Sequence, residues 1–179
     1  MKFINKFKSP NFNNRNNSKI KFIIIHYTAL KNSKTAIQFL CDEKNKVSSH
    51  FLISQNGSIY SLVDIKKRAW HAGNSAWMNY RNINSYSIGI ELDFSYEFKN
   101  NSYNYKMIAS LKKLLKYLLI KYKLKNTNIL GHSDIAPFRK IDPGPKFPWY
   151  KLSLSNLVFY PSLVMFYHDG PVDRRTVHG

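Results

Sequence analysis

Acidic residues and cysteines are both scarce in this chain. Its 179 residues include 10 Asp and Glu against 28 Lys and Arg, which gives a formal net charge of +18 and a pI near 10.0. Cys41 is the single cysteine, so no intrachain disulfide can stabilise the fold. No apolar run approaches the ~20 residues of a membrane-spanning helix, so we expect no transmembrane segment. The length fits one domain, and the 44% of apolar residues suffice for a core.

Arginine is also scarce, with 6 residues against 22 lysines. Surfaces that clamp phosphates or read bases favour arginine, because its planar guanidinium binds them through two hydrogen bonds. The 19 asparagines point instead to the codon bias of an AT-rich genome. We therefore expect no nucleic-acid partner, although a cationic protein is attracted to polyanions such as the bacterial cell wall.

The two ends of the chain differ from its middle. Residues 1–20 are basic, rich in asparagine and without apolar periodicity, which predicts an irregular basic arm. They contain no apolar core of a secretory signal, so we expect a cytoplasmic protein, with the cell envelope as the alternative. Residues 152–179 contain no lysine and form an atypical C-terminal tail, although the apolar string LVFYPSLVMFY within it could cover part of the core. Residues 21–151 remain as the single folded domain.

Hydrophobic periodicity predicts strands interspersed with helices. A helix is expected from Ser33, with Cys41 on its apolar face, and Asn56-Gly57 between two apolar runs predicts a hairpin with a type I′ turn. A long amphipathic helix should pack on the sheet with its lysines in solvent; binding to a membrane surface is the alternative. The predicted elements are strands at 21–26, 51–54, 58–63, 87–92 and 128–132 and helices from 33 and over 103–124. This pattern predicts a single α/β domain with a mixed central β-sheet flanked by helices.

Two histidines and one aspartate lie where the chain should hold them rigidly. His26 ends the string KFIIIH, His132 ends NILGH, and Asp142 lies in a segment stiffened by Pro143 and Pro145. Two histidines and a carboxylate are a common catalytic zinc set. Their spacing alone does not bring them together, and each histidine taken alone is more often an ordinary surface or core residue.

Five motifs resemble those of the zinc-dependent N-acetylmuramoyl-L-alanine amidases. In chain order they are IIIHYTA, VSSHFLISQNGSIYSLV, RAWHAG, NSYSIGIEL and GHSDIAPFRKIDPGPKFPW, and the resemblance covers residues 9–149. The family includes AmpD-type, AmiD-type and phage amidases and is related to peptidoglycan recognition proteins. The resemblance implies their fold and a Zn²⁺-dependent cleavage of the amide bond between N-acetylmuramic acid and L-alanine, in peptidoglycan or in anhydro-muropeptides.

The resemblance also implies a role for individual residues. Zinc would be held by His26, His132 and Asp142. Glu91 matches the catalytic carboxylate of the family and Lys140 its catalytic lysine. Without the family, Glu91 would read as a surface acid at a strand end and Lys140 as an ordinary lysine. Contacts with substrate are expected from Trp70, His71, Asn84 and Arg139, and His50 is expected near the cleft but not on the metal.

Several alternatives stay open at this point. Trp70 could pack in the core, and Arg139 could brace its loop instead of binding a peptide carboxylate. Asp134 is expected to cap a local turn, although its position near His132 suggests a ligand. The protein, expected to be a monomer, could also be a peptidoglycan-binding module without catalysis. Recognition relatives of that kind typically lack a zinc ligand, and this chain has all three.

Overall fold

A five-stranded mixed sheet forms the centre of the computed structural model, which describes residues 1–99 and 102–160. The strand order is β4-β3-β8-β2-β9, and β2 pairs in parallel with both β8 and β9. Strand β3 is parallel to β8 and antiparallel to β4. The strands are β2 (Phe22–Tyr27), β3 (Phe51–Ile53), β4 (Ile59–Ser61), β8 (Ser87–Leu92) and β9 (Ile129–Gly131). The predicted mixed sheet is confirmed.

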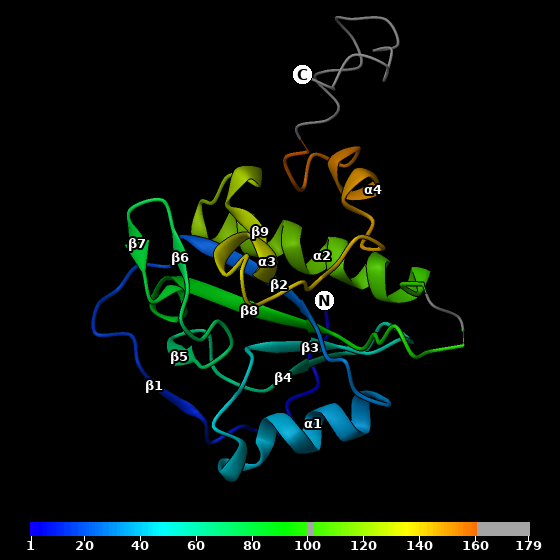
Figure 1. Cartoon of the computed structure of the whole chain (residues 1–179), viewed down its shortest axis with the longest axis horizontal. Helices are drawn as coiled ribbons and strands as arrows, with labels where there is room; N and C mark the ends of the chain where they lie inside the picture. The colour runs from blue at the N-terminus through cyan, green and yellow to red at the C-terminus, as the bar shows by residue number, and fades with distance from the viewer. Residues whose placement is uncertain (100–101, 161–179) are drawn as a thin grey trace, which may run out of the picture.

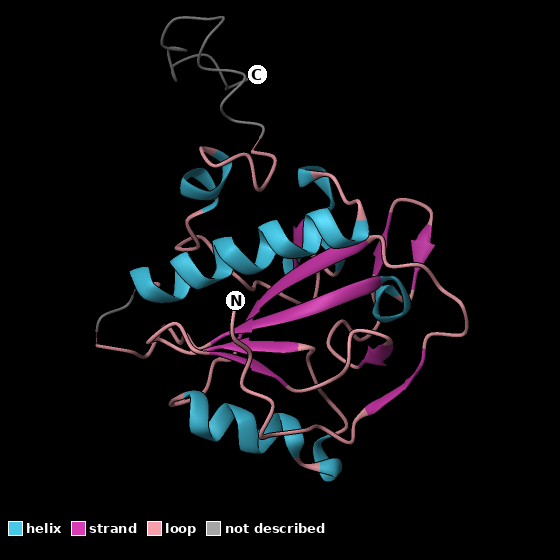
Figure 2. Ribbon diagram, turned by 180° about the vertical axis from the view of Figure 1, so that it is seen from behind, coloured by secondary structure: helices cyan, strands magenta, loops and turns pink. Residues whose placement is uncertain are grey.

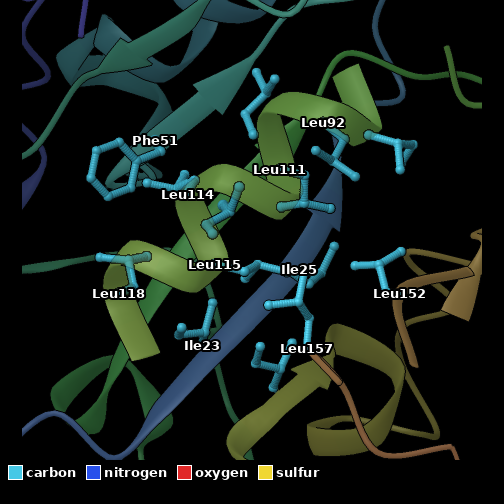
Figure 3. Close-up of a cluster of buried hydrophobic side chains, with 14 of the residues drawn as sticks. Ile23, Ile25, Phe51, Leu92, Leu111, Leu114, Leu115, Leu118, Leu152 and Leu157 are labelled. Atoms are coloured by element: carbon cyan, nitrogen blue, oxygen red, sulfur yellow. The ribbon is translucent and has the colours of Figure 1, made fainter. Parts of the chain in front are cut away.

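Helices cover the two faces of this sheet (Figures 1 and 2). Helix α2 (Tyr105–Tyr122) lies along one face, where its leucines pack on Ile23 and Ile25 of β2 (Figure 3). Helix α1 (Ser33–Cys41) packs on the other face against Leu52 of β3. The apolar stripe of α2 is therefore part of the core, and among the described residues no helix is long and apolar enough to cross a membrane.

Local capping explains where these helices begin. The side chain of Asn104 accepts a hydrogen bond from the backbone N–H of Lys106, and the side chain of Asn32 accepts one from Thr35.

Cys41 is half-buried against the α1 cluster, and burial raises the pKa of its thiol. The predicted apolar role of Cys41 is confirmed.

The predicted hairpin joins β3 to β4, but its turn is not of type I′. The backbone N–H of Gly57 donates to the carbonyl of Ser54, and Gly57 alone in the loop has a positive φ, of 85°. This is a three-residue loop in which a left-handed glycine follows the turn, because type I′ would need positive φ at Asn56 as well.

The N-terminal segment, expected to be irregular, is packed on the domain. Strand β1 (Phe12–Asn14) pairs antiparallel with β5 (Lys67–Ala69). Asn11 is buried, and its amide donates to two backbone carbonyls. Arg15 is buried and donates to four more. Hydrogen bonds of polar side chains hold the segment. Because these side chains are polar, they produce no apolar periodicity in the sequence.

The first part of the expected tail belongs to the domain. Helix α4 (Trp149–Ser153) brings Leu152 into the core, and Leu157 and Val158 follow it there. Residues 161–179 of the tail lie outside the described residues. The remaining elements are strands β6 (Ala76–Trp77) and β7 (Tyr80–Arg81), helix α3 (His132–Ile135) and 3-10 turns at Glu43–Asn45, Ile83–Tyr86 and Asn126–Asn128.

The carboxyl ends of the parallel strands place three polar residues at one edge of the sheet. His26 is the penultimate residue of β2 and lies opposite Glu91, the penultimate residue of β8. His132 follows directly on β9 and begins α3. Strands β8, β2 and β9 are neighbours in the sheet (Figure 1). Because parallel strands end at the same edge, the sheet itself brings these residues together.

Candidate active site

Three buried side chains converge at this edge. The Nδ1 atom of His26 lies 3.0 Å from Nδ1 of His132 and 3.0 Å from Oδ2 of Asp142. The Nδ1 atom of His132 lies 3.1 Å from the same carboxylate oxygen. All three ligand atoms fall within 4.8 Å of one another, so they could hold one metal ion.

Backbone and side-chain contacts fix the loop that carries Asp142. The backbone carbonyl of Asp142 accepts a hydrogen bond of 2.9 Å from the N–H of Ser133. The hydroxyl of Tyr103 donates to the carbonyl of Pro143 over 2.7 Å, and its ring stacks on Phe94. The third ligand is thus tied both to α3, which begins with His132, and to the aromatic part of the core.

The protonation of His132 suits a cation. Its Nε2 lies 3.1 Å from the carbonyl oxygen of Ala72, which can only accept, so Nε2 carries the proton. A neutral imidazole then has a lone pair on Nδ1, and this lone pair faces the carboxylate of Asp142. A cation between the two groups satisfies both, and the carbonyl of Ala72, which accepts from the other ring N–H, orients the histidine as is usual for metal ligands.

Burial acts on the ionisation of this cluster. It lowers the pKa of His26 to about 4, against the opposing effect of the Asp142 carboxylate. Burial alone would raise the pKa of Asp142, but the contacts of its carboxylate with His132 and His26 outweigh this effect and bring that pKa well below its usual range. A neutral His26 beside an ionised Asp142 has the protonation states that metal binding requires.

Glu91 contributes a carboxylate of which one oxygen has no hydrogen-bond partner among the described residues. Its Oε2 atom is buried, and no donor among the described residues lies within hydrogen-bonding distance of it. The pKa of Glu91 is raised to about 8, because burial and the nearby Asp142 carboxylate together outweigh the lowering effect of Lys140. A carboxylate with a raised pKa next to a candidate metal site is suited to proton transfer near neutral pH.

A cavity of about 520 Å³ unites most of the residues predicted from the sequence. It is bounded by the three candidate ligands and by Glu91, and its apolar wall includes Phe39 and Leu40 of α1. Four further predicted residues line it, namely Trp70, His71, Arg139 and Lys140.

Two of these four residues also brace the cavity wall. Arg139 donates through Nη2 to the backbone carbonyls of Ala72 and Asn74, each over 2.8 Å. The indole N–H of Trp70 donates to the side chain of Asn13, and its backbone N–H donates to Ser48. The bracing function considered for Arg139 is therefore present, and Trp70 is half-buried at the cavity instead of enclosed in the core.

Asn84 and the other two predicted histidines lie behind the ligands. Asn84 is buried outside the cavity lining, and its Oδ1 accepts from the backbone N–H groups of His71 and Ala72. Nδ1 of His71 lies 3.0 Å from Nε2 of the candidate ligand His26. His50 is buried, accepts from the N–H of Gly89 and is not in the ligand cluster, as expected.

Asp134 has the capping function expected of it. Its Oδ2 accepts a hydrogen bond of 2.7 Å from the backbone N–H of Gly131, at the start of α3. Sequence reasoning missed Ser87 and the carbonyl of Ala72, which contact His71 and His132. A backbone carbonyl leaves no side-chain signal in a sequence, whereas Ser87 in the string SIGIEL could have been considered.

Known proteins are similar in sequence to this chain over most of its length. The family model described as N-acetylmuramoyl-L-alanine amidase matches residues 16–145. N-acetylmuramoyl-L-alanine amidase AmiD of Escherichia coli is 38% identical over an alignment that covers 87% of this chain and 62% of AmiD. The 1,6-anhydro-N-acetylmuramyl-L-alanine amidase AmpD of Haemophilus influenzae is 34% identical, with 80% of this chain and 87% of AmpD aligned. The chain thus spans about three fifths of AmiD but most of AmpD.

Solved structures agree with these matches. The complex of E. coli AmiD with anhydro-N-acetylmuramic acid-L-Ala-D-gamma-Glu-L-Lys superposes with a TM-score of 0.72 at 33% identity, covering 87% of this chain and 63% of that one. AmpDh3 of Pseudomonas aeruginosa, in complex with anhydromuramic pentapeptide, gives 0.72 at 31% identity, with 93% and 72% covered. Together with the family match over residues 16–145, these relatives show that the chain belongs to the N-acetylmuramoyl-L-alanine amidase family.

Proposed function

We propose that this protein is a zinc amidase that hydrolyses the bond between the lactyl group of N-acetylmuramic acid and L-alanine. The observation that carries the proposal is the convergence of His26, His132 and Asp142 in one cavity with the unpartnered carboxylate of Glu91. Family membership supports the same reaction.

Zinc is the metal that suits the three side chains. Two neutral imidazoles and one carboxylate favour zinc over harder ions such as magnesium, and three protein ligands leave a fourth position open. A bound zinc would supply Lewis acidity, which polarises a carbonyl and makes water acidic near neutral pH. The chain supplies the ligand geometry and a partly apolar cavity around it.

Two further residues have chemical functions in this proposal. Glu91 would accept a proton from the attacking water and return one to the amine that leaves. Its raised pKa keeps the protonated form accessible for the second transfer. Lys140 lines the same cavity, and its ammonium group would stabilise the negative charge that develops on the carbonyl oxygen.

The cavity also offers surfaces for the substrate. Trp70 presents an aromatic face suited to a sugar or a peptide, and Arg139 presents a cation suited to a peptide carboxylate. Two related structures are complexes with anhydromuramic peptides, which favours an anhydro-muropeptide here, with intact peptidoglycan as the second substrate. A cytoplasmic location would suit the former and stays a prediction.

The test is to incubate zinc-loaded protein with a purified anhydro-muropeptide and, separately, with intact sacculi. Mass spectrometry should detect a stem peptide with a free L-alanine amino group. Release from the muropeptide alone, or from both substrates, identifies the substrate class. Binding of either substrate without release would support the non-catalytic peptidoglycan-binding module and contradict the proposed function.

A further inference from the structure

The tautomer of His26 follows from a chain of three hydrogen bonds. The carbonyl oxygen of Ile83 can only accept, so the hydroxyl of Ser87, 2.7 Å away, donates its one proton to it. The same hydroxyl must then accept from Nε2–H of His71, at 3.1 Å. Nδ1 of neutral His71 is thereby an acceptor, and it accepts from Nε2–H of His26 over 3.0 Å. This leaves Nδ1 of His26 as a lone pair that faces Asp142.

The tautomer of the second histidine ligand, His132, depends on Ala72, the residue that follows His71. The carbonyl of Ala72 accepts from Nε2–H of His132, which leaves the lone pair of His132 on Nδ1 as well. The same carbonyl accepts from the guanidinium of Arg139 over 2.8 Å. Two adjacent residues, His71 and Ala72, therefore set the tautomers of both histidine ligands.

Two neighbours hold this dipeptide in place. Oδ1 of Asn84 accepts from the N–H of His71 over 2.9 Å and from the N–H of Ala72 over 2.7 Å. The ring of His71 lies directly on Gly89 of β8, where a Cβ would come within 2.5 Å of its Cγ and 2.8 Å of its Nδ1. Any larger residue at position 89 would displace the atom that accepts from His26.

We propose that the His71–Ala72 dipeptide, clamped by Asn84, is the positioning element that fixes the direction and tautomer of both metal-binding histidines. The inference rests on the proposed zinc site. Both ring nitrogens of His71 are engaged within the protein, and Oδ1 of Asn84 accepts two backbone bonds. In this proposal His71 and Asn84 act through the ligands, and the substrate contacts expected from the sequence stay a prediction.

The zinc dissociation constant, measured by competition with a chelator, tests the positioning function of the His71–Ala72 dipeptide directly. The variants His71→Asn and His71→Gln are both polar and smaller than histidine, but Asn places an acceptor where Nδ1 was, and Gln places its polar atoms where Nε2 was. We expect His71→Asn to stay within a few fold of the parent and His71→Gln to bind about 10- to 100-fold more weakly, the usual effect of losing a group that orients a ligand.

Asn84 and Gly89 give independent variants. Asn84→Asp keeps an oxygen acceptor for the two N–H groups and should bind zinc nearly as the parent does, whereas Asn84→Leu should bind about 10- to 100-fold more weakly. Gly89→Ala should also weaken binding. The absorption spectrum of the Co²⁺-substituted protein should change for Asn84→Leu and Gly89→Ala but not for Asn84→Asp, because it reports the coordination geometry.

Asn56→Ala is the matched control. Its side-chain oxygen also accepts two hydrogen bonds, from Ser58 and Ser54, but it lies in the β3–β4 loop outside the cavity lining. It should lower the melting temperature without changing zinc affinity. If the parent binds zinc and His71→Gln binds it as tightly as His71→Asn, the positioning function is overturned. If the parent binds no zinc, the proposed function fails and this inference fails with it.

Discussion

Nδ1 of His26 lies 3.0 Å from Oδ2 of Asp142, although the two residues are 116 positions apart in the chain. His26 lies on strand β2, and Asp142 lies in the loop that follows α3. The loop is anchored at Asp142 itself by the N–H of Ser133 and at Pro143 by the hydroxyl of Tyr103. The site is therefore held by the sheet on one side and by the aromatic core on the other.

Replacing Glu91 by glutamine should separate catalysis from metal binding. Glutamine keeps the size of the side chain but cannot accept the proton of water, so turnover should fall by ~10²–10⁴. Zinc content should remain that of the parent, because Glu91 is outside the ligand cluster. The measurements are turnover on a muropeptide and zinc per chain. An undiminished rate in Glu91→Gln would contradict the proton-transfer role.

Lys140→Ala should also keep zinc and lose rate. Loss of one group that stabilises the developing oxyanion commonly costs ~10²–10³ in turnover. Lys146→Ala is the matched control, because Lys146 is an exposed lysine in the same region that does not line the cavity. Equal rates for the two variants would show that Lys140 is one lysine among many.

The ionisation of Glu91 should make the metal-free protein less stable as pH rises. Burial raises the pKa of Glu91 from its ordinary 4.5 to about 8, so the folded chain binds this proton more tightly than the unfolded chain. The free energy of unfolding should fall between those two pH values by on the order of a few kcal/mol. Glu91→Gln cannot ionise and should remove this fall.

Urea denaturation of the chelator-treated protein at pH 5 and pH 8 measures the difference. The stability of Glu91→Gln relative to the parent should be higher at pH 8 than at pH 5. The exposed Glu97 provides the control, and Glu97→Gln should show no such trend. A relative stability of Glu91→Gln that is independent of pH would show that the buried carboxylate does not titrate in this range.

Leu157 should stabilise the domain although it follows residues 16–145, which the family model matches. It is 7% exposed and packs in the α2 cluster, whereas Leu154 in the same segment is 66% exposed. Leu157→Ala should cost about 2–5 kcal/mol and Leu154→Ala almost nothing, because only the former leaves a cavity. Deletion from Leu157 onward should likewise lower the melting temperature. Similar melting temperatures for the two point variants would contradict the packing of Leu157.

The sequence predicts the elements with strong apolar periodicity. The strands that end at His26 and Leu92 and the long helix after residue 103 are found within a few residues of their expected limits. The N-terminal segment was expected to be irregular because it lacks apolar periodicity, and its packing went unnoticed because Asn11 and Arg15 hold it through hydrogen bonds to backbone carbonyls. The type of the Gly57 turn also differs, because loop length and the φ of Asn56 depend on how β3 and β4 pair.

The candidate ligands could be named from the sequence, but only through resemblance to a family. Spacing does not show that His26 and Asp142 meet, because a parallel sheet and a structured loop bring them together. The position of Asn84 behind the site was not predictable either. A buried amide that accepts from two backbone N–H groups leaves the same sequence signal as one that contacts a sugar.

The zinc content of the protein tests the central claim most directly. After removal of metal by a chelator and dialysis against zinc, the parent should retain about one zinc per chain, held by two histidines and one aspartate. His26→Ala, His132→Ala and Asp142→Ala should each lose tight binding, while Asp134→Ala should retain it. A parent without zinc, or stoichiometric zinc in all three ligand variants, would contradict the account.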